Sequence, residues 1–190
     1  IGYENNKVAT RHNGEVNYHD TEALIGADGP NSQVAKSANL YGERKFWIAR
    51  QCRAKIKCEK DLFKVYFNKE IKPDFFGWVV PENEDVARVG IGSENNSEQY
   101  FKKFLNELGN PEIIDYQAGL IPIYDPKPRR SNNNVYLIGD AASQVKAISG
   151  GGIIKGMLAA EELSKALLKN LDYEKLWRKR MGMDLLINLK

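Results

Sequence analysis

Residues 135–163 combine an acidic side chain with three consecutive glycines. The apolar run 135–138 ends in Gly139-Asp140, and glycines fill positions 150–152 before a helix-like apolar stretch begins. Three glycines give up side-chain packing at a helix start, which is useful when a ligand must approach the backbone closely. The alternative is a tight strand-to-helix turn that binds nothing.

A second apolar run, residues 23–27, also ends at an aspartate, Asp28. Strands buried on both faces read as continuous apolar runs, and their carboxyl ends are where α/β sheets place ligands. An aspartate there can accept hydrogen bonds from sugar or polyol hydroxyls, and the N–H groups of the following helix suit an anion or a carbonyl oxygen. Taken singly, each aspartate is more often a helix N-cap. We expect segments 23–28 and 135–140 to be neighbouring strands of one layer.

Local patterns predict the elements that position these turns. A hairpin is expected within residues 1–28, turning at Asn13-Gly14. Alternating apolar residues predict an antiparallel sheet, with strands near 45–57, 62–68, 75–81, 85–93 and 113–124. A helix is expected at 97–109, with Ser97 as N-cap and Gly109 as its stop. Two more helices follow the triple glycine and are joined near 171–172, so the predicted fold class is α+β.

Composition argues against several classes of function. The 190 residues carry a net charge of +3 without a long basic block, so we expect no nucleic-acid partner. The basic segment "KPRR" at 127–130 reads as a solvated loop. No apolar run has the length needed to cross a bilayer. Cys52 and Cys58 read as a buried, reduced pair rather than a disulfide or a metal site, and we expect no bound metal.

The two acidic turns resemble known flavoprotein fingerprints. The segment "GADGPNSQVAK" at 26–36 is similar to the Asp-Gly fingerprint of flavoprotein hydroxylases and their relatives. The segment "VYLIGDAASQVKAISGGGI" at 135–153 is similar to their Gly-Asp fingerprint, and above all to its version in the geranylgeranyl reductase family. The segment "FFGWVVP" at 75–81 resembles that family's aromatic-x-Trp-x-x-Pro motif. The resemblance covers nearly the whole chain in order and spacing.

This resemblance implies FAD as cofactor and a para-hydroxybenzoate hydroxylase-like fold, which is α/β in the complete protein. Asp140 would bind the ribityl chain, and Asp28 would shape the cofactor cleft. The other implied cofactor-binding residues are Gly139, Ala141, Gly151, Gly152 and Ile153. The implied substrate-binding residues are Phe75, Phe76, Trp78 and Pro81, with ordinary sheet packing as the alternative for the aromatic ones. No catalytic side chain is implied, because the flavin carries the chemistry.

The implied function is reduction of isoprenoid (geranylgeranyl) double bonds in a lipid or prenyl substrate by hydride transfer from FAD. One alternative on the same fold is a flavin monooxygenase, a hydroxylase or an electron-transfer flavoprotein-quinone oxidoreductase-like protein. Another is a non-catalytic binding fragment. The resemblance leaves the electron donor undecided between NAD(P)H and ferredoxin. We expect a cytoplasmic protein and leave peripheral membrane contact open.

The chain also departs from the family pattern. Lys146 stands where a small polar residue is usual and Ala147 where a proline is common. No G-x-G-x-x-G follows a strand, so the sequence shows no motif that would bind the ADP half of FAD. We therefore expect a segment that lacks its N-terminal dinucleotide-binding unit and is inactive in isolation. The expected division assigns 1–43 and 125–170 to the FAD-binding domain, 44–124 to a substrate-binding sheet domain, and 171–190 to a C-terminal helical region.

Overall fold

The computed structural model describes residues 2–4, 6–67 and 75–187. The chain divides into two compact units. Unit 1 combines residues 1–44 with 122–190, and unit 2 spans residues 45–121.

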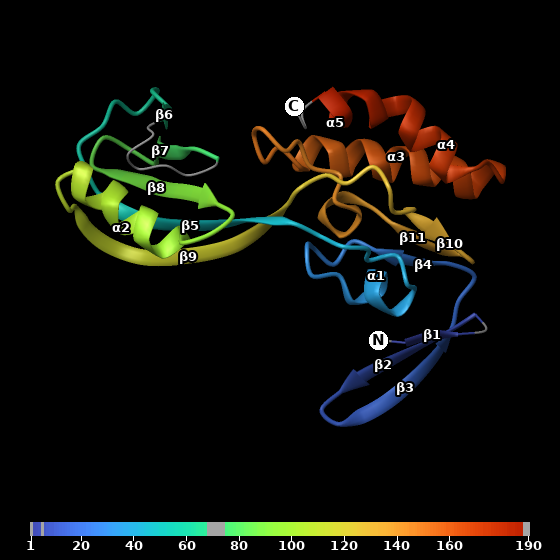
Figure 1. Cartoon of the computed structure of the whole chain (residues 1–190). Helices are drawn as coiled ribbons and strands as arrows, with labels where there is room; N and C mark the ends of the chain where they lie inside the picture. The colour runs from blue at the N-terminus through green and yellow to red at the C-terminus, as the bar shows by residue number, and fades with distance from the viewer. Residues whose placement is uncertain (1, 5, 68–74, 188–190) are drawn as a thin grey trace. The chain divides into compact units, whose positions relative to one another are not determined.

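A small parallel pair lies at the centre of unit 1. Strand β11 (Val135–Leu137) runs between β10 (Ser131–Asn132) and β4 (Leu24–Gly26). Strands β11 and β4 are parallel, with Leu137 paired to Gly26 (Figure 1). The predicted neighbourhood of the two segments is therefore confirmed. Because the strands are parallel, the turns that follow them leave the sheet at the same edge.

The N-terminal part of unit 1 forms a separate antiparallel sheet of β1 (Gly2–Glu4), β2 (Lys7–His12) and β3 (Glu15–Asp20). Its β2–β3 turn lies at Asn13-Gly14, and both residues have positive φ angles of 49° and 87°. Two successive positive φ angles match the twist of a tight hairpin. The predicted hairpin is confirmed. Helix α1 (Gln33–Ser37) follows β4.

Helices make up the C-terminal part of unit 1. A 3₁₀ turn, η1 (Gly139–Ala142), follows β11, and α3 (Ile153–Lys169) begins directly after the triple glycine. Asn170 ends α3 in the left-handed conformation, and α4 (Tyr173–Trp177), a π-helical stretch (Arg178–Gly182) and α5 (Met183–Ile187) follow. They bury one apolar cluster, formed by Tyr124, Ala159, Leu163, Ala166, Tyr173, Trp177, Met181 and Leu185. No helix in the described part of the chain is both long and apolar enough to span a bilayer.

The prediction of a solvated "KPRR" loop holds for Lys127 and Arg129, which are exposed, but is wrong for Arg130, which is only 2% exposed. Its guanidinium donates to the backbone carbonyls of Asp125 and Pro128. The guanidinium also lies 5.7 Å from the ring centroid of Tyr124 and 5.5 Å from that of Trp177. Burial lowers the pKa of Arg130 to about 10. Trp177 is distant in sequence, so the local run of basic residues could not predict that the Arg130 guanidinium is buried beside this ring.

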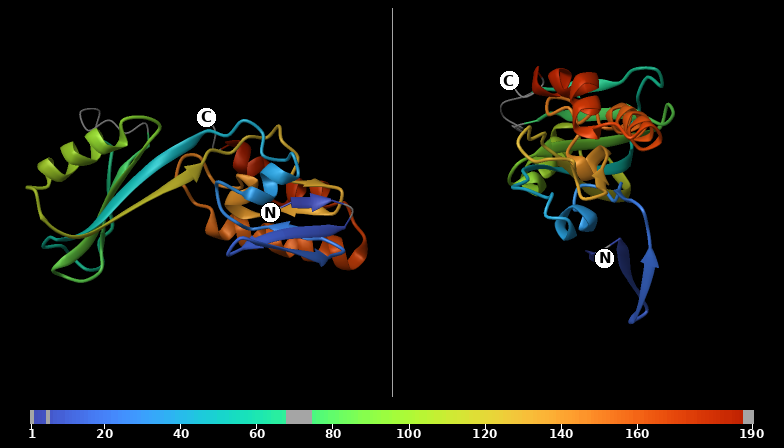
Figure 2. Two further views of the ribbon diagram at one scale, coloured as in Figure 1. Left: turned by 90° about the horizontal axis from the view of Figure 1, so that it is seen from below. Right: turned by 90° about the vertical axis from the view of Figure 1, so that its right-hand side faces the viewer.

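Unit 2 is a five-stranded sheet in the order β6-β7-β8-β5-β9. Its strands are β5 (Phe46–Lys55), β6 (Lys64–Tyr66), β7 (Gly77–Pro81), β8 (Val86–Ser93) and β9 (Glu112–Pro122). Strands β6, β7, β8 and β5 pair antiparallel, as predicted. Helix α2 (Ser97–Glu107) covers one face of the sheet (Figures 1 and 2). The α+β class is therefore confirmed.

Helix α2 packs an apolar face on the sheet. Phe101 and Phe104 are buried in a cluster with Cys52, Ala54, Val79, Ala87, Val89 and Ile91. The predicted N-cap is wrong, because Asn96 takes that position with a left-handed φ of 54°. The Ser97 hydroxyl instead accepts a hydrogen bond from Arg50.

The cysteines are free, but they do not form the buried pair that we predicted. Cys52 is fully buried, and burial raises the pKa of its thiol to about 11. Cys58 lies beyond the end of β5, and its partly exposed thiol donates to the carbonyl of Asn83. The two cysteines are six residues apart, an even spacing that would place both on one face of a continuous strand, but β5 ends at Lys55, before Cys58.

Candidate functional site

A pocket of about 310 Å³ lies in unit 1, where the turns after β4 and β11 meet the start of α3. It is lined by Ala27, Gly29, Ile138, Gly139, Asp140, Gly152, Ile153 and Gly156. Four of the predicted cofactor residues line it, namely Gly139, Asp140, Gly152 and Ile153. The other three, Asp28, Ala141 and Gly151, lie next to pocket residues in the chain without lining the pocket.

The Asp140 carboxylate faces this pocket without a hydrogen-bond donor among the described residues. Burial raises its pKa, because taking a carboxylate out of water disfavours its charged form. The N-cap of η1 is Ile138, so Asp140 does not take the capping role that was the alternative for it. Its carboxylate oxygens therefore keep unused capacity to accept hydrogen bonds on the pocket side.

Glycines make room around Asp140. A Cβ atom added at Gly152 would lie 2.9 Å from an Asp140 carboxylate oxygen, so a side chain there would displace the carboxylate. A Cβ atom added at Gly156 would lie 3.4 Å from the Cα atom of Gly139, so Gly156 lets α3 approach η1. Sequence reasoning missed Gly156, although its spacing of four residues from Gly152 places both glycines on one helix face.

Asp28 has a different environment. Its carboxylate accepts hydrogen bonds from the Ser32 hydroxyl at 2.6 Å and from the N–H groups of Gln33 and Val34 at 2.7 and 3.2 Å. Burial pushes its pKa upward, but these hydrogen bonds outweigh burial and hold the pKa below its ordinary value. The N-cap of α1 is Ser32, and Asp28 supports the helix start by accepting from Ser32 and from the first two helical N–H groups. Asp28 thereby fixes the turn that contributes Ala27 and Gly29 to the pocket.

Aromatic rings gather in unit 2 around the predicted substrate segment, and the exposed Phe67 approaches them with its ring centroid 6.0 Å from that of Phe76. Phe75 stacks on Trp47 at 5.4 Å and on Phe76 at 4.1 Å, and Phe76 meets Trp78 edge-on at 5.9 Å between centroids. We call Trp47, Phe75, Phe76 and Trp78 the aromatic surface.

Two glycines of β8 leave space for these rings. A Cβ atom at Gly90 would lie 2.3 Å from the Trp78 ring, and one at Gly92 would lie 2.6 Å from the Phe75 ring. The rings therefore rest directly on the strand. Pro81 lies at the opposite end of β7, paired with Ala87.

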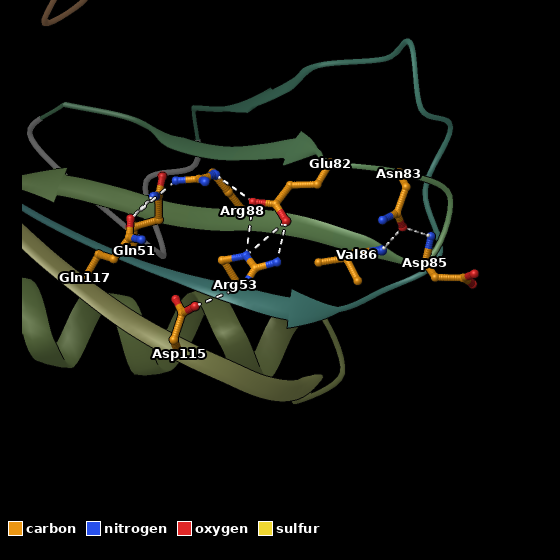
Figure 3. Close-up of polar contacts among 9 residues, drawn as sticks. All are labelled: Gln51, Arg53, Glu82, Asn83, Asp85, Val86, Arg88, Asp115 and Gln117. Atoms are coloured by element: carbon orange, nitrogen blue, oxygen red, sulfur yellow. Dashed lines mark hydrogen bonds and ion pairs between the residues drawn. The ribbon is translucent and has the colours of Figure 1, made fainter.

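A polar network occupies the sheet near Pro81 (Figure 3). Arg53 donates to both carboxylate oxygens of Glu82, and Arg88 donates to Glu82 at 2.8 Å. Arg53 and Arg88 are direct register partners, so Glu82 offsets the repulsion between two like charges. Hydrogen bonding from Arg53 is the largest cause that lowers the pKa of Glu82.

The network also reaches the aromatic surface. The Trp78 indole N–H donates to Gln51 at 2.9 Å, and the Gln51 amide donates to Gln117 at 2.8 Å. Arg88 completes this series of hydrogen bonds by donating to the Gln117 side-chain oxygen at the long distance of 3.5 Å (Figure 3). The orientation of the indole is therefore fixed from one side by hydrogen bonding and from the other by Gly90.

Comparison with known sequences connects both sites to one family. Residues 47–121 match the model of the geranylgeranyl reductase catalytic domain. A geranylgeranyl diphosphate reductase of Nicotiana tabacum is 36% identical over 85% of this chain and 39% of its own length. Digeranylgeranylglycerophospholipid reductase 2 of Methanothermobacter thermautotrophicus is 32% identical over 88% of this chain and 49% of its own length. The chain thus spans about half or less of the length of these relatives.

Solved structures agree with the sequence comparison. A geranylgeranyl bacteriochlorophyll reductase-like protein of Thermoplasma acidophilum has a TM-score of 0.80 at 27% identity, covering 99% of this chain and 55% of that protein. A flavin-dependent halogenase has a TM-score of 0.63 at 19% identity, over 95% of this chain and 36% of its own. A Klebsiella pneumoniae protein complexed with FAD and uric acid has a TM-score of 0.61 at 15% identity, covering 93% of this chain and 51% of that protein.

The last two likenesses concern the fold alone, and they confirm the predicted para-hydroxybenzoate hydroxylase-like architecture. The sequence matches and the Thermoplasma structure carry the family assignment. The chain is therefore homologous to the geranylgeranyl reductases, and its residues 47–121 match the model of their catalytic domain.

Proposed function

We propose that the full-length protein binds FAD at the pocket of unit 1 and reduces carbon–carbon double bonds of an isoprenoid chain. The observation that carries this proposal is the Asp140 carboxylate, which is partly buried, has a raised pKa and faces the pocket opposite Gly152. Such a carboxylate is poorly satisfied by its own protein, so ligand hydroxyl groups improve its surroundings.

The residues present fit the ribityl and isoalloxazine parts of FAD. Asp140 would accept hydrogen bonds from ribityl hydroxyls, while the lack of bulky side chains at Gly139 and Ala141 would let the ribityl chain approach the backbone closely. Gly151, Gly152 and Ile153 would offer the N–H groups at the start of α3 to the pyrimidine edge. Negative charge is favoured at a helix N-terminus. Bound FAD supplies the hydride for double-bond reduction.

The aromatic surface supplies the substrate wall in this proposal. Phe75, Phe76 and Trp78 present apolar ring faces, and Pro81 extends this strand toward the polar network. An isoprenoid chain offers only apolar contacts, which such rings favour. The names of the relatives in tobacco and Methanothermobacter support a prenyl diphosphate or a prenylated glycerophospholipid as the substrate class. We infer a cytoplasmic enzyme that meets lipid substrates at the membrane periphery and takes electrons from NAD(P)H or ferredoxin.

Removing the Asp140 carboxylate tests the proposal. We expect Asp140→Ala in the full-length protein to weaken FAD binding by about 1.5–3 kcal/mol, or roughly tenfold to a hundredfold, because one charge-assisted partner is lost. The measurement is a titration with FAD, followed by visible flavin absorbance after purification. The matched control is Asp172→Ala, which removes the cap of α4 away from the pocket.

The glycines provide a second pair of variants. Gly152→Ala should weaken FAD binding because its Cβ atom displaces the Asp140 carboxylate. Gly151→Ala should weaken it less, because the Cβ atom added there meets only the Ser149 hydroxyl oxygen at 3.2 Å and leaves Asp140 in place. Full flavin content combined with a lowered thermal midpoint in Asp140→Ala would contradict the cofactor role.

A further inference from the structure

One guanidinium connects the two turns that form the pocket. Arg44 donates to the carbonyl oxygen of Pro30 at 3.0 Å in the turn after β4. In the turn after β11 it donates to the carbonyl oxygens of Ala141 at 2.6 Å and Asp140 at 3.4 Å. Pro30 and Asp140 are 110 residues apart in sequence (140 − 30), so the guanidinium joins two turns that are distant in the chain.

The Arg44 side chain is itself held in place. Its Nε atom donates to the carbonyl of Tyr41 at 3.0 Å, and its guanidinium lies 4.1 Å from the centroid of the Tyr41 ring. The Tyr41 hydroxyl in turn contacts the Pro30 carbonyl at 3.4 Å and the Asn31 side chain at 3.2 Å. Burial lowers the pKa of Arg44, although arginine stays charged at neutral pH.

The hydrogen bonds that Arg44 donates all go to backbone carbonyls, so they set the positions of the turns. Of the four residues whose carbonyls accept from Arg44, three lie in the two turns, namely Pro30, Asp140 and Ala141. Asp140 is also the residue proposed to bind the ribityl chain. A shift of either turn would move Ala27 and Gly29 relative to Gly139 and Asp140.

We propose that Arg44 is a positioning residue for the cofactor pocket: it clamps the turn after β4 to the turn after β11 and so sets the distance across the FAD site. The cofactor part of this inference rests on the proposed function. An arginine is required because its planar fork presents donors in several directions at once. Lysine keeps the charge, but its single ammonium group cannot hold both turns and stack on Tyr41.

The test compares Arg44→Ala and Arg44→Lys with Arg178→Ala in the full-length protein. Arg178 is a matched control, because it also stacks on an aromatic ring, Trp177 at 4.6 Å, and donates to a backbone carbonyl, that of Pro126, away from the pocket. We expect both Arg44 variants to bind FAD about tenfold more weakly, with Arg178→Ala unchanged in FAD affinity. Added ethylguanidinium should partly restore FAD affinity in Arg44→Ala only.

Hydrogen exchange of the FAD-free protein provides a readout that does not need the cofactor. Amides of residues 29–33 and 139–143 should exchange faster together in Arg44→Ala and keep their rates in Arg178→Ala. Unchanged exchange in these turns, wild-type FAD affinity in Arg44→Lys, or loosened turns with unchanged FAD affinity would each overturn the inference. If the wild type binds no FAD, the proposed function fails, and exchange alone then decides whether Arg44 clamps the turns.

Discussion

Asp28 and Asp140 follow neighbouring parallel strands, yet their carboxylates have opposite surroundings. Asp28 accepts three hydrogen bonds from the start of α1, whereas Asp140 accepts none from the described residues. The pKa of Asp28 is accordingly lowered and that of Asp140 is raised. One aspartate stabilises the turn, and the other is kept at a cost to stability, which is typical of a binding residue.

The raised pKa predicts that Asp140→Asn stabilises the FAD-free protein. A carboxyl whose folded pKa lies above its unfolded value favours folding in its protonated form, so the cost appears as pH rises through these values. Asparagine resembles the protonated form at every pH. We expect the thermal midpoint of Asp140→Asn to exceed that of the wild type at neutral pH and to match it in acid. A lower midpoint at neutral pH would contradict the assigned surroundings of Asp140.

Asp28→Ala should have the opposite dependence on pH. Loss of the carboxylate that accepts from the first N–H groups of α1 costs about 1 kcal/mol in the free energy of unfolding. Because the folded pKa of Asp28 is lowered, its contribution is present above the unfolded value and is lost as pH falls through the folded value. Urea titrations at neutral and acidic pH should therefore show a difference between variant and wild type that shrinks in acid. A difference that is independent of pH would show that the charge of Asp28 is not involved.

At the scale of elements, β8 carries two glycines because two rings of the aromatic surface lie on it. We expect Gly90→Val to displace the Trp78 indole, change the near-UV circular dichroism and cost about 1–3 kcal/mol through overpacking. The control is Gly119→Ala in β9, where an added Cβ atom meets nothing within 4 Å. An unchanged tryptophan signal in Gly90→Val would mean that the ring does not rest on the strand.

Elements governed by local chemistry could be predicted from the sequence. The Asn13-Gly14 hairpin and the alternating strands of unit 2 follow from residue type and spacing. Features that depend on distant partners could not: the burial of Arg130 needs Trp177, and the contacts of Arg44 need the turn at Asp140. The N-cap of α2 was missed because Asn96 uses a left-handed backbone and no side-chain hydrogen bond.

The candidate site was predictable only in part for the same reason. The motif around Asp140 indicated a ligand-binding turn, and four of the predicted cofactor residues in it line the pocket, namely Gly139, Asp140, Gly152 and Ile153. The motif could not separate Gly152, whose Cβ atom would meet Asp140, from Gly151, whose Cβ atom would not. That distinction depends on the direction in which each Cα–Cβ bond points, and sequence order alone does not fix it.

At the scale of the whole molecule, the described residues form apolar cores that do not cross between the two units. The cluster around Phe104 lies wholly within unit 2, and the clusters around Trp177 and Leu137 lie wholly within unit 1. The catalytic-domain match covers unit 2, whereas Asp140 and Arg44 belong to unit 1. The proposed substrate wall and the proposed cofactor pocket therefore depend on different cores.

This separation predicts that a core substitution acts on one unit. Phe104 is fully buried between α2 and the sheet, so Phe104→Ala should destabilise unit 2 by about 3–5 kcal/mol. Amides of β5, β7 and β8 should then exchange faster, while those of α3 keep their protection, because no residue of the Phe104 cluster belongs to unit 1. Trp177→Ala is the reciprocal control, and it should loosen α3 and α4 while leaving β5 and β8 protected. Equal loss of protection in both units after either substitution would contradict independent cores and would mean that the two units unfold as one.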